Sequence, residues 1–154
     1  MKRLSLTYSG SFPNYEPVKR MLEGIGLAFK KINQDIVVPR GQVEALFAMA
    51  ARLRKQHSIA VACFGHAGDG NIHVNLMLDE SQPDFMKRCN AAQDDLFRGV
   101  LKLGGTITGE HGIGLAKKPW WPLAASTETR SVHSLGKARV GSKGDFEPGK
   151  VCLT

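Results

Sequence analysis

Two short apolar segments flank a turn that is rich in Gly, Asp and Asn. The first segment covers residues 58–63 and the second covers 74–78. The intervening residues, 64–73, include three glycines, one Asp, one Asn and two histidines, His66 and His73. Strand-forming runs separated by such residues predict a β-hairpin. His66 then ends the first strand and His73 begins the second.

The second strand of this hairpin has two different faces. Side chains alternate along a strand, so one face is apolar and the other carries polar groups (Ile72, Val74, Leu76 and Leu78 against His73, Asn75 and Met77). The apolar face is expected to pack against the core, and the polar face is available for chemistry. Residues 59–64 are apolar on both faces, so we expect that strand to be central and covered on both sides.

The order of the remaining elements predicts the fold class. Residues 35–38 form a short strand ended by Pro39, and residues 106–108 form a β-branched strand. Helical apolar spacing covers 42–57 and a second segment from Pro83 to the glycines at 104 and 105. Strand, helix, strand, strand, helix, strand is the order of a ferredoxin-like α+β fold, with one antiparallel sheet and both helices on one face. The other face would need a domain, a partner, a cofactor or a second copy to cover it.

Three parts of the chain are expected. Residues 1–30 form a partial N-terminal segment, with helical spacing over 16–29 that two glycines weaken. Residues 31–118 form the domain core. Residues 119–154 form an irregular and helical C-terminal extension, with a helix over 128–140 capped by Thr127.

Charge and cysteine content restrict the partners and the compartment. The 154-residue chain has a formal net charge of +7 and three cysteines. Its basic residues are scattered without interleaved aromatics, so we expect a solvated basic surface and no nucleic-acid partner. His57 and His133 are interpreted as surface helix residues. An odd number of widely spaced cysteines favours free thiols in a reducing compartment. We expect a cytoplasmic location, with peripheral attachment at the inner face of a membrane as the alternative.

The two hairpin histidines are candidate metal ligands. Glu110 follows the last expected strand, and two imidazoles with one carboxylate form a three-ligand site with an open position for substrate. The adjacent His111 would serve as a base at neutral pH. The alternative is structural, because the turn alone explains the glycines and the histidines would then only bracket it.

Two segments carry a resemblance to a known family. Residues 104–114 resemble one signature of the FAD-linked oxidase C-terminal domain. The other signature of that domain resembles the hairpin turn, Gly65-His66-Ala67-Gly68-Asp69-Gly70-Asn71-Ile72-His73. Residues 31–40 resemble a weaker third segment, and the likeness covers about residues 31–118. This is the substrate domain of flavoenzymes such as D-lactate dehydrogenase, the glycolate oxidase flavoprotein subunit and D-2-hydroxyglutarate dehydrogenase.

The resemblance implies a reaction and a set of site residues. A D-2-hydroxy acid of the lactate, glycolate or 2-hydroxyglutarate type would be oxidised to the 2-oxo acid, with hydride passing to the flavin N5. A divalent ion, zinc or manganese, would be held by His66, His73 and Glu110. His111 would deprotonate the substrate hydroxyl, and Asn75 resembles a substrate-contact position. The resemblance assigns no flavin-binding residue in this chain.

The family holds its FAD mainly in a separate N-terminal domain, and this chain has nothing of that kind. Its tail also departs from the family pattern at Gly141, Ser142 and Glu147. We therefore expect a C-terminal piece of the enzyme that needs an FAD-binding domain or subunit and turns over little alone. The alternatives are a non-catalytic metal- or acid-binding or interaction domain and, third, a metal-dependent hydrolase. A homo-oligomer is a further expectation.

Overall fold

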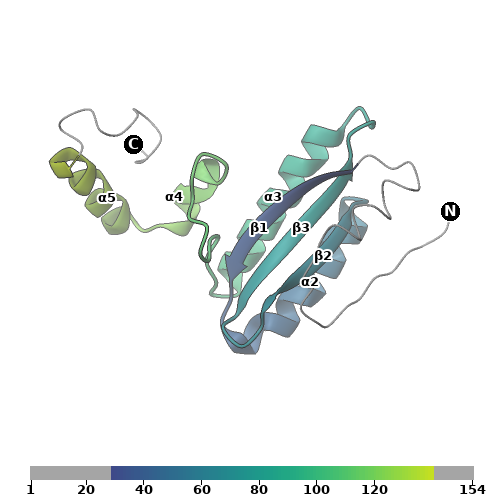
Figure 1. Ribbon diagram of the computed structural model, residues 1–154, viewed down its shortest axis with the longest axis horizontal. Coiled ribbons are helices and arrows are strands. Elements are labelled where there is room, and N and C mark those ends of the chain that lie inside the picture. The colour runs from purple at the N-terminus through teal and green to yellow at the C-terminus, as the bar shows by residue number, and fades with distance from the viewer. Residues whose placement is uncertain (1–28, 141–154) are drawn as a thin grey trace. The chain divides into compact units, whose positions relative to one another are not determined.

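The computed structural model describes residues 29–140, which belong to two compact units. The first unit ends at Gly109 and holds the sheet with two long helices (Figure 1). The second unit begins at Glu110 and is helical. The helical pattern expected before Phe29 and the tail after Val140 lie outside the described residues. The division of the chain at residues 30 and 118 stays a prediction.

The sheet has three antiparallel strands in the order β1-β3-β2, which are β1 (Phe29–Val37), β2 (Ala60–His66) and β3 (Asn71–Asp79). The predicted hairpin is confirmed as β2 and β3. The prediction that its first strand is central is wrong, because among residues 29–140 β3 lies between the other two strands and β2 is at the edge of the sheet. The apolar character of β2 comes from small side chains such as Ala62 and Cys63, which are only partly buried.

The expected fourth strand is reduced to a single bridge beside β1. Val37 and Thr106 exchange backbone hydrogen bonds of 3.2 and 2.8 Å. The Thr106 hydroxyl then donates to the Thr108 carbonyl at 2.7 Å. Such a local side-chain bond competes with continued strand pairing. The bridge lies at the point of the chain where the fourth strand was expected. The predicted α+β fold is therefore confirmed, with three strands and a bridge in place of four strands.

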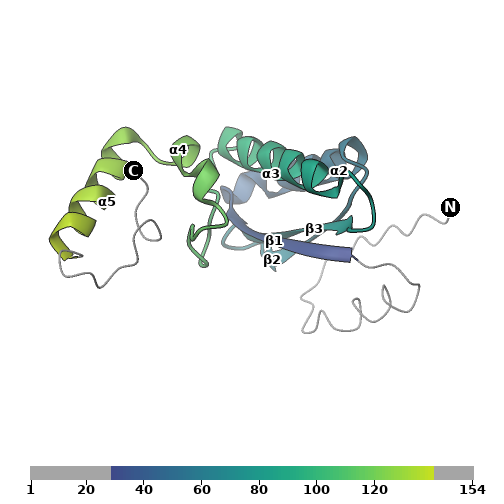
Figure 2. The same ribbon diagram turned by 90° about the horizontal axis from the view of Figure 1, so that it is seen from above.

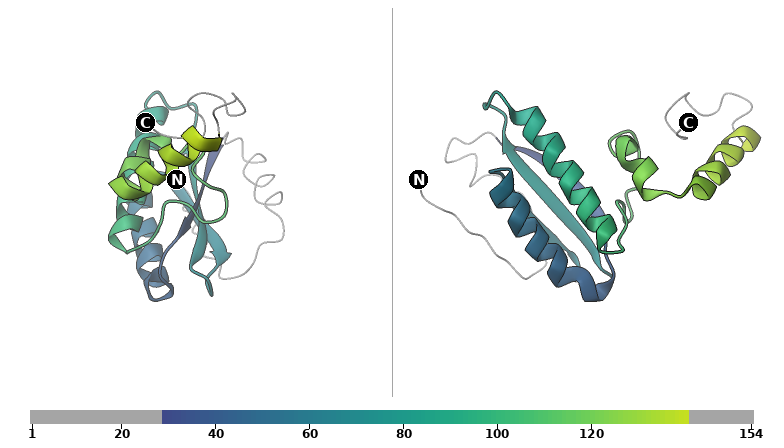
Figure 3. Two further views of the ribbon diagram at one scale, coloured as in Figure 1. Left: turned by 90° about the vertical axis from the view of Figure 1, so that its left-hand side faces the viewer. Right: turned by 180° about the vertical axis from the view of Figure 1, so that it is seen from behind.

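Two helices cover one face of this sheet. A 3₁₀ turn (Arg40–Gln42) leads into α2 (Val43–Gln56), and α3 (Phe85–Lys102) follows the hairpin. Figure 2 shows the helices as one layer and the strands as the other, and in the right-hand view of Figure 3 both helices cross in front of the sheet. The core lies between these layers, and its largest side chains include Ile36, Leu46, Ile72, Leu76, Leu96 and Phe97.

One predicted surface residue belongs to the helix layer instead. His57 follows the last residue of α2, and its Nε2 lies 2.8 Å from Oδ2 of Asp95 on α3. Its side chain is only 10% exposed. The interpretation of His57 as a surface residue is therefore wrong, because the end of α2 directs its ring toward the neighbouring helix.

The second unit contains a 3₁₀ turn (Lys118–Trp120), α4 (Trp121–Ala124) and α5 (Thr127–Val140). The helical extension is thus confirmed. Its expected cap is displaced by one residue, because the Ser126 hydroxyl accepts the Thr129 N–H at 3.1 Å. His133 is exposed, as expected, and its ring makes a T-shaped contact with that of Trp121, with 5.2 Å between the centroids. Over residues 29–140 no helix is both long and apolar enough to cross a membrane.

Candidate functional site

The tip of the β2–β3 hairpin is a short hydrogen-bonded turn. The Asp69 N–H donates to the His66 carbonyl at 3.0 Å, and the Gly70 carbonyl accepts the Val38 N–H at 3.0 Å. Gly70 has φ +74°, and a Cβ there would collide with the Val38 carbonyl. Only glycine fits this position without strain. The turn thereby fixes the register in which His66 pairs with Asn71.

The strand register places both histidines on the same face of the sheet. His66 lies opposite Asn71, and His73 lies two residues further along β3. Opposed residues and residues two apart on a strand share a face. Such diagonal neighbours are roughly 7–8 Å apart at Cα, which allows two imidazoles to approach one ion.

This face is the one that the helices do not cover. Gln34 on β1 bonds to Gln93 on α3, so its side chain points toward the helix layer. Its partner in the sheet is Val74, whereas the neighbouring pair is Asp35 with His73. Alternation therefore directs Asp35 and His73 away from the helices, as predicted for His73.

His73 lies between a carboxylate and an aromatic ring. Its Nδ1 is 3.9 Å from Oδ1 of Asp35 on β1, and its ring centroid is 5.1 Å from that of Phe64 on β2. The Asp35 side chain is 1% exposed and the His73 side chain 12%. In metal sites a ligating histidine usually donates its second ring N–H to such a carboxylate, and the separation here is longer than a hydrogen bond.

The second oxygen of Asp35 binds the main chain. The Gly109 N–H donates to its Oδ2 at 3.0 Å. A Cβ on Gly109 would lie 2.6 Å from Asp35 Oδ1 and 2.8 Å from Asn71 Oδ1. The absence of a side chain at residue 109 is thus what allows the chain to pass over these two groups.

Asn75 lies next along the same face of β3. It is 2% exposed and pairs in register with Asn33 on β1 and Ala62 on β2. Its Oδ1 accepts no hydrogen bond from the described residues. Burial of an amide oxygen without a donor is unfavourable, so a polar group placed there would be bound favourably. The predicted role of Asn75 as a substrate contact stays a prediction.

Glu110 and His111 are the first residues of the second unit. Their side chains are 60% and 52% exposed, and His111 Nε2 lies 3.5 Å from Glu110 Oε1. The assignments of Glu110 as a third ligand and of His111 as a base stay predictions. Over residues 29–140, no three His, Cys, Asp or Glu side chains form a ready metal-binding group.

The chemistry of the described donors fits a metal ion in part. His66 and His73 supply imidazole nitrogens on the sheet face that α2 and α3 do not cover, and His73 has the Asp35 carboxylate beside its ring. Asp35 was missed by sequence reasoning as a site residue. The signal that could have found it is a lone carboxylate followed by the apolar run Ile36–Val38, where a charged side chain is unfavourable unless it has partners.

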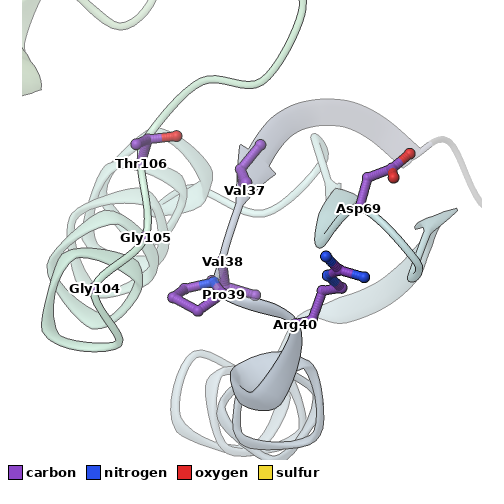
Figure 4. Close-up of a pocket in the computed structure, with 8 residues that line it drawn as sticks. All are labelled: Val37, Val38, Pro39, Arg40, Asp69, Gly104, Gly105 and Thr106. Atoms are coloured by element: carbon purple, nitrogen blue, oxygen red, sulfur yellow. The ribbon is translucent and has the colours of Figure 1, made fainter.

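A surface hollow of about 330 Å³ lies at the end of β1. Figure 4 shows the Arg40 and Asp69 side chains on one side of it and the backbone of Gly104 and Gly105 on the other. Both charged side chains are exposed. The hollow therefore adjoins the hairpin turn, and its charges lie at the surface.

The sequence matches a known family over most of its length. The sequence model of one protein family, the C-terminal domain of FAD-linked oxidases, matches residues 19–151. The glycolate oxidase subunit GlcD of Bacillus subtilis (strain 168) is 33% identical over 120 residues, which is 78% of this chain and 26% of that protein.

Two further relatives have related names. The D-2-hydroxyglutarate dehydrogenase of Stutzerimonas stutzeri (strain A1501) is 29% identical over 121 residues, covering 76% of this chain and 26% of that protein. The D-lactate dehydrogenase of Anaerostipes hadrus is 29% identical over 119 residues, covering 77% of this chain and 25% of that protein. This chain spans about a quarter of the length of these relatives. By the extent of the family match, the chain belongs to the FAD-linked oxidases and corresponds to their C-terminal domain.

Proposed function

We propose that this chain is the substrate- and metal-binding part of an FAD-dependent oxidoreductase. Its reaction would convert a D-2-hydroxy acid of the lactate, glycolate or 2-hydroxyglutarate type into the 2-oxo acid. The names of the relatives support a hydroxy-acid substrate. The observation that carries the proposal is the arrangement of His66, His73 and Asn75 on the one sheet face that α2 and α3 leave open.

In this proposal, His66, His73 and Glu110 hold a divalent ion, zinc or manganese. When bound, the ion supplies a Lewis acid for the substrate oxygens, and the flavin supplies the acceptor for the hydride. His111 takes the proton from the substrate hydroxyl, since a neutral imidazole is a suitable base near pH 7. The Asn75 amide orients the substrate. Proton and hydride together account for the two hydrogens that separate a hydroxy acid from its oxo acid.

The first experiment measures the metal content of the purified full chain. About one zinc or manganese ion per chain is expected in the wild type and much less in His73→Ala. The matched control is His133→Ala, because it removes an exposed imidazole on α5 that is not assigned to the site. Equal metal content in the wild type and His73→Ala would contradict the ligand assignment.

A second experiment separates the enzyme from its alternative. The chain is mixed with a purified, FAD-loaded flavin domain from a member of the same family, and reduction of a dye is followed with D-lactate, glycolate or D-2-hydroxyglutarate. The proposed function predicts that activity appears only in the mixture. If metal binds but no mixture is active, a non-catalytic metal- or acid-binding domain is the better description.

A further inference from the structure

A buried carboxylate on β1, that of Asp35, lies next to the proposed metal site, and the proposed function gives it no role. Asp35 is 1% exposed and lies on the same face as His73. Burying a charged carboxylate is unfavourable unless hydrogen bonds and charges compensate. Its position therefore requires partners, and the Gly109 N–H is one of them.

We propose that Asp35 is a positioning residue, which keeps the proton of His73 on Nδ1 and leaves the Nε2 lone pair for a ligand. This inference rests on the proposed function of the site. Oδ1 of Asp35 lies 3.9 Å from His73 Nδ1. This separation is longer than a hydrogen bond, so Asp35 acts on the ring through its charge. A negative oxygen at Nδ1 favours the tautomer that carries the proton there, and a metal then binds at Nε2.

The two carboxylate oxygens of Asp35 contact different groups. While Oδ1 faces the ring of His73, Oδ2 accepts the Gly109 N–H at 3.0 Å. Gly109 directly precedes Glu110, the proposed third ligand. One carboxylate therefore restrains the imidazole of one proposed ligand and the backbone just before another.

The decisive variant is Asp35→Asn, which keeps the size of the side chain. Its amide oxygen can accept the Gly109 N–H, so its NH₂ group then faces His73 Nδ1. A donor at Nδ1 favours the opposite tautomer, with the proton on Nε2. The change thus reverses the polarity of one contact and retains the other.

The readout is the tautomer of His73 in the ¹⁵N-histidine-labelled full chain, measured by NMR without metal at about pH 8.5, where an ordinary imidazole is neutral. The signals of His73 are assigned by their loss in His73→Gln. We expect the Nδ1–H tautomer in the wild type and a shift toward Nε2–H in Asp35→Asn. The Nε2–H tautomer in the wild type would overturn the inference even if the variant fails to fold, as would the same tautomer in both proteins.

The matched control is Gln34→Leu. Gln34 is the adjacent residue of β1, is 3% exposed and points toward α3 instead of His73. This variant should be destabilised without any change in the His73 tautomer. A tautomer change in Gln34→Leu equal to that in Asp35→Asn would mean that general loosening of β1 is the cause, and would overturn the inference.

Zinc titration of the same proteins separates this inference from the proposed function. We expect Asp35→Asn to bind zinc about 10- to 100-fold more weakly than the wild type, as is typical when the carboxylate behind a ligating histidine is lost. Equal zinc affinity in both proteins would overturn the positioning role and leave the metal site intact. If the wild type binds no zinc but its tautomer reverses as expected, the metal assignment fails and the Asp35–His73 relationship stands.

Discussion

The backbone N–H of Gly109 donates a hydrogen bond to the buried carboxylate of Asp35 at 3.0 Å, across 74 positions of sequence. The contact joins the start of the domain to the loop that leads into Glu110. It also explains why this chain has glycine at position 109, since a Cβ there would lie 2.6 Å from Asp35 Oδ1.

Replacing Gly109 with alanine should therefore be costly. We expect Gly109→Ala to lower the free energy of unfolding by about 1–3 kcal/mol, because the new methyl group displaces the Asp35 carboxylate or the Asn71 amide. Urea denaturation measures the change. The control is Gly68→Ala in the exposed hairpin turn, where no atom lies within 4 Å of the added Cβ. Its effect should stay within about 0.5 kcal/mol, and equal losses in the two variants would contradict the steric explanation.

A buried amide pair joins the sheet to α3. Gln34 donates to Gln93 Oε1 at 2.9 Å. Gln34→Leu alone should cost about 1–3 kcal/mol, because it leaves a buried oxygen without its donor. Gln34→Leu combined with Gln93→Leu should recover much of that loss, since both polar groups are then gone. Denaturation of the two single variants and the double variant measures the coupling. Additive losses would show that the pair is not coupled.

Burial raises the pKa of the Cys63 thiol to about 12. The thiol of an unfolded chain has a pKa of about 8.5. The folded chain therefore retains this proton over a pH range where the unfolded chain releases it. The contribution to stability is full below about pH 8.5 and decreases as the pH rises toward 12. We expect the stability difference between the wild type and Cys63→Ala to decrease by roughly 1–2 kcal/mol from pH 8.5 to pH 10.

The control for this pH effect is Val61→Ala, which shortens a side chain on the same face of β2 without removing an ionisable group. Its stability difference from the wild type should not vary with pH. A Cys63→Ala difference that is equally constant from pH 7 to pH 10 would contradict the raised thiol pKa.

The cap of α5 offers a local test. Ser126→Ala removes the hydroxyl that accepts the Thr129 N–H, and loss of such a cap costs about 1 kcal/mol. Amide hydrogen exchange in the first turns of α5 should become about fivefold faster as a result. Thr127→Ala, at the position that the sequence favoured as the cap, should have a smaller effect. The reverse order would restore Thr127 as the capping residue.

Local patterns were sufficient to predict the hairpin and the helices. The helix expected over 42–57 is observed as α2 over Val43–Gln56, because an apolar stripe at helical spacing defines both the element and its buried face. The assignment of His73 and Asn75 to the face opposite Ile72 and Val74 likewise follows from alternation alone.

Properties that depend on distant pairing were not predictable in the same way. β1 begins at Phe29, six positions before the expected start, because Lys30, Lys31 and Asn33 hide its strand pattern. The edge position of β2 is a matter of strand order, which its own residues do not encode. Asp35 could be recognised as a partner of His73 only from the register of β1 against β3.

The strand order β1-β3-β2 also determines the order in which the strands can pair during synthesis. Both outer strands pair with β3, so during synthesis β1 has no partner in this three-stranded sheet until residues 71–79 have left the ribosome. The hairpin closes quickly because its strands are adjacent in sequence, whereas β1 must be recruited across the whole of α2. Because Asp35 is part of β1, His73 acquires its carboxylate neighbour only in this later, slower step of folding.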